Sequence, residues 1–236
     1  MMFYQRTVFP ALLDHLAKKQ ITVLTGMRRT GKTTLLKALM ERSPLAQKVY
    51  FDLERIDNRE FFAEKNYENI VYALSQRGFD LEQPLLIAID EIQMAPNLPS
   101  VVKYLYDTCG FKFILTGSSA YYLRNTFNES LAGRKKLFEI HPLTFGELLT
   151  FNGILFEPLA DWQELRFVKS EYERLKAFYE MYVQFGGFPE VVLAESEADK
   201  KDLIGDILSS YINYDIAVLA DIRKSTELYK LVRLLS

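Results

Sequence analysis

The chain has 236 residues, of which 49% are hydrophobic and 25% are charged, a balance that supports a folded core and argues against intrinsic disorder. The formal net charge of −2 gives no overall basic character, so bulk electrostatics do not indicate nucleic-acid binding. A lone cysteine, Cys109, excludes an internal disulfide. No apolar run approaches the length of a membrane span and no signal-peptide pattern is present, so we expect a cytoplasmic protein.

The first elements of the chain predict a phosphate-binding loop. An amphipathic helix over residues 9–19 leads into Ile21–Thr25, a short, apolar, β-branched run that is typical of a buried strand. Residues 26–33 match the pattern GxxxxGK[ST], and a helix is expected over residues 34–42. A strand, a glycine loop and a helix N-terminus together make an anion site, because backbone N–H groups converge there and the helix dipole favours negative charge.

Each position of this loop is a candidate for nucleotide binding. The candidates are Gly26, Met27, Arg28, Arg29, Thr30, Gly31, Lys32, Thr33 and Thr34. We expect Lys32 to reach the β- and γ-phosphates and the Thr33 hydroxyl to hold Mg²⁺. The side chains of Arg28 and Arg29 stand at variable loop positions, so we expect them to point outward as solvated or interdomain charges.

A second motif indicates hydrolysis. After a strand at residues 48–51, the continuous apolar run Leu85–Ile89 predicts another buried strand, and Asp90 and Glu91 follow it directly. Ligands of parallel sheets lie beyond the carboxyl ends of the strands, so Asp90 is the expected carboxylate on the metal side. Glu91 is expected to orient or deprotonate the attacking water, the alternative for this residue being a helix N-cap.

The remaining elements predict the fold class. Further strands are expected at residues 111–116 and 136–140, with helices over 59–77, 98–108 and 119–131. Five strands with intervening helices indicate an α/β fold with a doubly wound parallel sheet. We expect an additional strand between the glycine-loop strand and the Asp-Glu strand, as in the ATPase branch of P-loop proteins. The last part of the chain predicts a smaller helical domain, with an aromatic stripe over residues 172–185 as its core and helices over 198–217 and 225–235.

Several strings resemble AAA+-type P-loop ATPases of a large prokaryotic family. The strings are GMRRTGKTTLL, LLIAIDEIQ, FILTGSS and LAGRKKLFEIHPLTFGELL, of which the first two are generic and the last is specific. The segment VQFGGFPEVV is similar to the Gly-Gly-x-Pro-Glu start of the family's C-terminal domain of unknown function. The resemblance implies an ATPase domain over residues 1–142 and a helical lid or start of the C-terminal domain over residues 143–236. Family members usually continue into a winged-helix-like segment.

Two further positions are candidates for catalysis. Ser118 follows the fourth strand and is our first choice for a hydroxyl that contacts the γ-phosphate or the lytic water, with Thr116 as second choice and an N-cap as the alternative. Gly133 predicts a helix C-cap that leaves Arg134 projecting from a sharp turn. The resemblance implies that Arg134 reaches the nucleotide of a neighbouring subunit, and the alternative is a solvated cation at a helix end.

Together these features predict an ATPase. We expect Mg²⁺-dependent binding and hydrolysis of ATP that drives a conformational switch in a homo-oligomer. ATP is expected over GTP, because no Asn-Lys-x-Asp guanine signature follows the fourth strand. The alternatives are a DNA-associated motor or loader that contacts DNA through a region beyond residue 236, a non-hydrolysing nucleotide sensor, and a small-molecule kinase.

Overall fold

The computed structural model describes residues 4–117, 131–157 and 166–212. Contacts divide the chain into two compact units. The sheet unit contains residues 8–27 and 31–140, and the helical unit contains residues 1–7, 28–30 and 141–236. Residues 28–30, the middle of the glycine loop, therefore group with residues from 141 onward. The expected domain limits, 1–142 and 143–236, stay a prediction.

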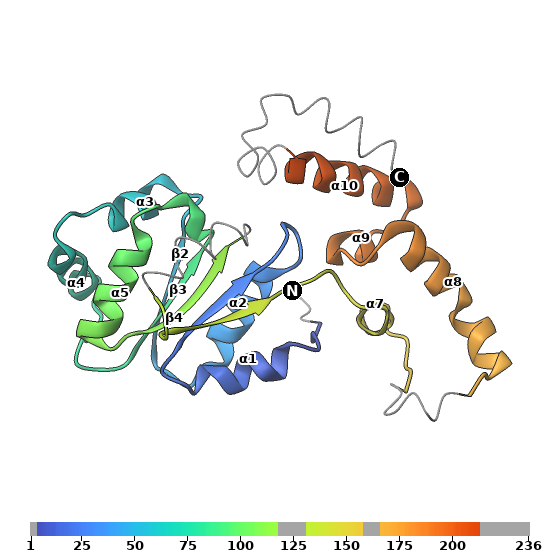
Figure 1. Ribbon diagram of the computed structural model, residues 1–236, viewed down its shortest axis with the longest axis horizontal. Helices are drawn as coiled ribbons and strands as arrows, with labels where there is room; N and C mark the ends of the chain where they lie inside the picture. Colours follow the sequence, from blue (N-terminus) through green and yellow to red (C-terminus); the bar gives the residue numbers. More distant parts are fainter. Residues whose placement is uncertain (1–3, 118–130, 158–165, 213–236) are drawn as a thin grey trace. The chain divides into compact units, whose positions relative to one another are not determined.

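The sheet unit contains a parallel sheet of five strands in the order β2-β3-β4-β1-β5 (Figure 1). The strands are β1 (Ile21–Thr25), β2 (Gln47–Asp52), β3 (Leu85–Asp90), β4 (Lys112–Gly117) and β5 (Lys135–Glu139). The predicted α/β class with a five-stranded parallel sheet is confirmed. The strand β4 lies between β1 and β3, so the glycine-loop strand and the Asp-Glu strand are separated in space as predicted.

Helices cover both faces of this sheet. Figure 1 shows α1 (Phe9–Leu16) and α2 (Lys32–Arg42) on one side, and α4 (Tyr67–Gln76) and α5 (Leu98–Cys109) on the other. Odd-numbered strand residues such as Val23, Ile87 and Leu115 join the core formed with α4 and α5. Their neighbours Leu24, Ala88 and Ile114 are also fully buried, because each strand is covered on both faces.

The helix predicted over residues 59–77 was wrong as a single element. The structure divides it into α3 (Ile56–Phe62) and α4. The Asn66 side chain accepts a hydrogen bond of 3.1 Å from the backbone N–H of Glu68, and this cap starts a new helix. A 3-10 turn, η1 (Ile92–Met94), precedes α5. The helix predicted over residues 119–131 lies outside the described residues except for Leu131.

The helical unit is described by α7 (Phe145–Phe151), α8 (Lys169–Phe185), α9 (Pro189–Leu193) and α10 (Glu197–Ser210). The prediction of an aromatic core stripe is only partly correct. Phe178 and Tyr182 pack against the α7 core, whereas Tyr172 and Tyr179 are about half exposed. Residues 213–236, with the helix predicted over 225–235, lie outside the described residues.

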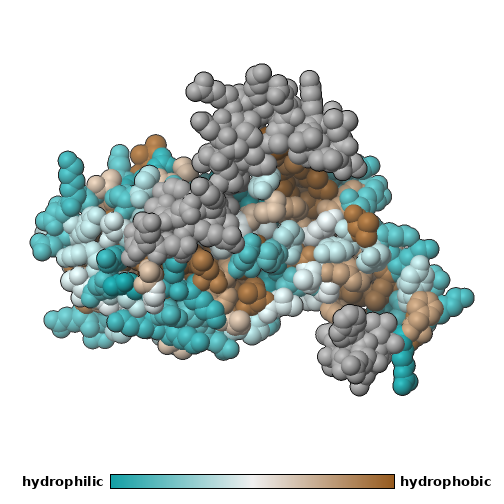
Figure 2. All heavy atoms as spheres, viewed as in Figure 1, coloured by the Kyte–Doolittle hydropathy of each residue, from teal (hydrophilic) through white to brown (hydrophobic). Residues whose placement is uncertain are grey.

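Apolar side chains also reach the surface of the molecule, as Figure 2 shows. In the helical unit they include Phe167 and Val183, which are 76% and 68% exposed. None of the helices in the described part of the chain combines the length and apolar character needed to cross a bilayer.

Candidate nucleotide site

The glycine loop begins with a close approach between two backbone segments. Gly26 follows β1 with a φ of +142°, and a Cβ at this position would lie 2.2 Å from the carbonyl oxygen of Ile140. The N–H of Ile140 donates to the carbonyl of Thr25 at 2.7 Å, which keeps the two segments together. Gly31, with a φ of +91°, immediately precedes α2. Both positions favour glycine, because L side chains rarely adopt such backbone angles.

Lys32 is the first residue of α2, and its side chain is folded against the loop. The residue is 4% exposed, and its Nζ donates to the carbonyls of Gly26 at 3.1 Å and Met27 at 2.6 Å. Thr33 is half-buried and Thr34 is exposed. A buried ammonium, a helix N-terminus and a glycine-rich turn are therefore adjacent, and this donor set fits the phosphates of a nucleotide.

Asp90, the last residue of β3, is 3% exposed and accepts hydrogen bonds on both carboxylate oxygens. The Tyr50 hydroxyl donates to Oδ2 at 3.0 Å, and the Thr116 hydroxyl donates to Oδ1. Strand alternation places all three side chains on the face that α2 covers, where the Lys37 ammonium lies 5.1 Å from the centre of the Tyr50 ring. Burial, and then the charge of Asp90, raise the pKa of Tyr50 well above its usual range, so the phenol stays a donor.

Glu91 has a left-handed backbone, with a φ of +56°. Its N–H donates to the Thr116 hydroxyl at 3.2 Å, and its carboxylate accepts a hydrogen bond from the Gln93 side chain. A glutamate in this region is uncommon and is held there by its surroundings, a situation that is frequent at functional sites. The buried hydroxyl of Thr116 thus contacts both acidic residues. Ser118, our first choice for a catalytic hydroxyl, lies outside the described residues.

Arg134 lies at the amino ends of the strands, opposite to the carboxyl ends where Asp90 and the glycine loop lie. It precedes β5 in a turn where Gly133 has a φ of +74°, and its carbonyl accepts a hydrogen bond from Ile21, the first residue of β1. Its guanidinium makes two hydrogen bonds to Asp107 of α5, at 2.8 and 3.0 Å. This bidentate pair lowers the pKa of the Asp107 carboxyl. Arg134 is therefore paired rather than freely projecting, and it lies at the strand ends away from the loop of its own chain.

The middle of the glycine loop is bound by residues that the motif did not indicate. Arg29, with a φ of +61°, forms an ion pair of 3.0 Å with Glu190, the second residue of α9. The carbonyl of Thr30 accepts a hydrogen bond of 3.0 Å from Arg6. We expected Arg29 to point outward as a solvated or interdomain charge, and the structure gives it a specific carboxylate partner, Glu190.

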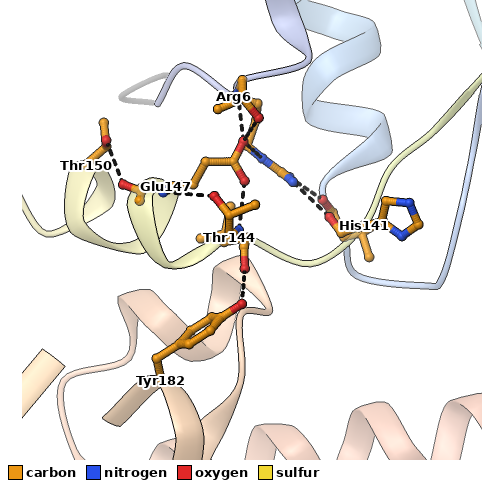
Figure 3. A network of polar contacts seen from close by, with 10 residues as sticks. Arg6, His141, Thr144, Glu147, Thr150 and Tyr182 are labelled. Atoms are coloured by element: carbon orange, nitrogen blue, oxygen red, sulfur yellow. Dashed lines mark hydrogen bonds and ion pairs between the residues drawn. The ribbon is translucent and has the colours of Figure 1, made fainter. Parts of the chain in front are cut away.

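Arg6 belongs to a buried polar network, shown in Figure 3. Its Nε donates to Glu147 of α7 at 3.0 Å, and a terminal nitrogen donates to the carbonyl of His141 at 2.8 Å. Glu147 also accepts from the backbone N–H groups of Thr7 at 2.7 Å and Thr144 at 3.0 Å. Burial opposes ionisation of Glu147, but these donors outweigh it and lower the pKa of the carboxyl.

The capping part of this polar network can be recognised in the sequence. Thr144 and Glu147 form a capping box at the start of α7, the pattern of a hydroxyl residue followed three positions later by glutamate. That pattern indicates a helix start, but it does not indicate the long-range partner Arg6. No comparable local pattern marks Tyr50 as a partner of Asp90.

The helical unit contains a separate cavity of about 1160 Å³ beside α7 and α8. Its lining is rich in aromatic and aliphatic side chains, among them Phe145, Leu149, Phe156, Leu175 and Tyr179. It contains none of the loop or strand-end residues described above, so we assign it no part in nucleotide binding.

Two family models match parts of the chain. Residues 18–149 match the family model described as AAA domain, and residues 176–236 match a domain of unknown function (DUF8612). An uncharacterized protein of Methanocaldococcus jannaschii is 30% identical over 215 residues, which cover 90% of this chain and 45% of the relative. An uncharacterized protein of Haemophilus influenzae is 27% identical over 217 residues, covering 90% of this chain and 50% of the relative. The chain thus spans about half the length of these curated relatives.

One solved structure has a similar fold over most of the chain. The Walker-type ATPase of Pyrococcus abyssi has a TM-score of 0.55 at 17% identity, covering 96% of this chain and 77% of that chain. At this level of identity the likeness concerns the fold alone.

Proposed function

The chain belongs to the AAA domain family, and on this basis we propose that it is an ATPase that binds ATP with Mg²⁺ and hydrolyses it. The observation that carries the proposal is the placement of the glycine loop and Asp90 at one edge of the parallel sheet. The loop follows β1, Asp90 ends β3, and β4 between them supplies Thr116 to the carboxylate. Ligands of such sheets bind beyond the carboxyl ends of the strands.

In this proposal the loop and the start of α2 hold the phosphates. Lys32 exchanges its two loop carbonyls for phosphate oxygens, and Gly26 and Gly31 let the backbone approach closely. Thr33 and Asp90 hold Mg²⁺, whose role is to neutralise charge on the phosphates. The described residues contain no group of three or more His, Cys, Asp or Glu that could bind a metal. Mg²⁺ needs only one or two protein ligands beside phosphates and water, so this finding fits the proposed site.

Glu91 acts as the residue that orients or deprotonates the attacking water. Its backbone position is fixed through the N–H bond to Thr116, so the metal carboxylate and the base share one anchoring hydroxyl. Tyr50 keeps the second oxygen of Asp90 in place. Ser118 remains the proposed catalytic hydroxyl after β4.

We further propose that hydrolysis drives a conformational switch in a homo-oligomer, with Arg134 acting on the nucleotide of a neighbouring subunit. The position of Arg134 at the amino ends of β1 and β5 supports action in trans rather than on its own loop. The guanidinium must then leave Asp107, and its planar fork suits a phosphate as well as a carboxylate. Association with DNA stays an expectation.

The proposed activity is tested by two measurements on the purified protein, namely ATP affinity by calorimetry and phosphate release with no acceptor present. The K32A protein should stay folded and lose ATP binding, while K103A, which removes an exposed lysine of α5, should bind normally. The E91Q protein should bind ATP and hydrolyse it poorly. If the K32A protein binds ATP with the affinity of the native protein, the proposed function is wrong. ATP binding without phosphate release by the native protein would leave a nucleotide sensor or a kinase.

A further inference from the structure

Residues 28–30 of the glycine loop are held by contacts within the helical unit. Thr30 is completely buried, and its carbonyl accepts the hydrogen bond from Arg6. Arg29 on its other side adopts left-handed backbone angles and pairs with Glu190. The conformation of the loop therefore depends on side chains that lie 24 and 161 positions away in the sequence.

Arg6 is suited to hold a backbone group in one place. The residue is 6% exposed, and its three nitrogens donate in three directions, to Glu147, to Thr30 and to His141. A planar guanidinium fixes the angles between these bonds, which an ammonium cannot do. Glu147, 3% exposed, is itself fixed by backbone N–H groups, so the guanidinium has a rigid support.

We propose that Arg6 is a positioning residue for nucleotide binding, an inference that rests on the proposed function. By holding the carbonyl of Thr30, Arg6 keeps the following N–H groups of Gly31 and Lys32 oriented for phosphate. The Arg6 side chain contacts the glycine loop at a backbone atom, the carbonyl oxygen of Thr30. A loop that is disordered before the nucleotide arrives binds it more weakly than a loop that is already ordered. The free energy needed to order the loop reduces the net free energy of binding.

The proposal predicts an effect on binding rather than on the chemical step. The residues proposed for catalysis, Asp90 and Glu91, are anchored by Tyr50 and Thr116 and not by Arg6. Loss of the Arg6 contact should therefore raise the Kd and KM for ATP and leave kcat within about 2-fold. A variant that merely unfolds part of the population would lower the apparent kcat and leave the KM unchanged.

Two variants test this without leaving an unpaired buried charge. R6K keeps a cation beside Glu147 but cannot also bond Thr30 and His141 in the same geometry. R6M/E147M removes both charges, a replacement that folded proteins tolerate better than the loss of one partner. Each should raise the Kd for ATP by about 10-fold, since hydrogen bonds of charged groups contribute on that scale.

The control is K112M in the sheet unit. Lys112 is another partly buried cation that donates to backbone carbonyls, those of His15, Lys18 and Gln20, and burial lowers its pKa to about 8. It lies at the amino end of β4, away from the glycine loop. The K112M protein should have a lower free energy of unfolding than the native protein and the same Kd for ATP.

The outcomes separate the two proposals. Native Kd and KM in both R6K and R6M/E147M, in a protein whose K32A variant loses ATP binding, would overturn the role of Arg6 and leave the ATPase intact. An equal rise of Kd in K112M would overturn it as well, because the effect would then reflect stability. If the native protein fails to bind ATP, both proposals fall together.

Discussion

The substitution Thr116→Val tests the arrangement of the two acidic residues at the end of β3. Valine keeps the volume and the branched shape of threonine and removes only the hydroxyl. That hydroxyl donates to the carboxylate of Asp90 and accepts from the N–H of Glu91 at 3.2 Å. Thr116 is fully buried, so no solvent water replaces either bond directly.

The expected loss follows from these two bonds. A hydrogen bond to a charged group contributes about 1.5–3 kcal/mol and one between neutral groups about 1 kcal/mol, so T116V should lose about 2–4 kcal/mol of unfolding free energy. Thr25 provides the matched control, because it lies at the carboxyl end of the neighbouring strand β1. Its hydroxyl is buried and has no hydrogen-bond partner among the described residues. T25V should therefore change the unfolding free energy by less than about 1 kcal/mol, with the sign toward greater stability.

Urea denaturation of the native protein and the two variants measures the difference, and phosphate release measures its effect on function. T116V should also hydrolyse ATP more slowly, because the metal carboxylate and the proposed base lose their common anchor. Equal stability of T116V and T25V would show that the hydroxyl does not bind both acidic residues in the way described.

Three further predictions concern other contacts of the site. Tyr50→Phe should lose about 1–3 kcal/mol in urea denaturation, because Asp90 loses a buried donor; an unchanged midpoint would contradict that bond. The pKa of Glu147 is lowered on folding, so its contribution to stability is present above the unfolded pKa near 4.5 and is lost as the pH falls through the folded value. The E147Q protein should therefore lose less unfolding free energy than the native protein as the pH falls below about 4.5. The R134A protein should bind ATP and hydrolyse it slowly. Mixing R134A with K32A should restore turnover, because one subunit supplies the arginine and the other binds the nucleotide. If mixed oligomers form and turnover is not restored, the role of Arg134 is limited to its ion pair with Asp107.

The sequence predicted the sheet well, because its signals are local. The runs at Ile21–Thr25 and Leu85–Asp90 are apolar on both faces, as expected for strands covered by helices on each side, and the structure makes both of them interior strands of the sheet. The position of the loop between a strand and a helix could be predicted for the same reason. The prediction of a single helix over residues 59–77 was wrong, because the Asn66 side chain caps a new helix within that range.

The contacts around the site could not be predicted from local patterns. The partner of Asp90 in β2 depends on which strands become neighbours, and the register of that pairing is a property of the whole sheet. The bonds from Arg6 to Thr30 and Glu147 join three distant segments, and nothing in the residues near Arg6 distinguishes it from a surface arginine. The roles of Glu91, Ser118 and Arg134 stay predictions.

The strand order also determines when the glycine loop can form during synthesis. β1 ends at residue 25, but its two neighbours in the sheet, β4 and β5, begin at residues 112 and 135. Gly26 moreover meets Ile140, the residue after β5. The ribosome thus completes most of the sheet unit before β1 has a hydrogen-bonded partner, and such non-local pairing slows folding. The glycine loop, and with it the proposed capture of a nucleotide, therefore depends on a strand that is synthesised more than 100 residues after the loop itself.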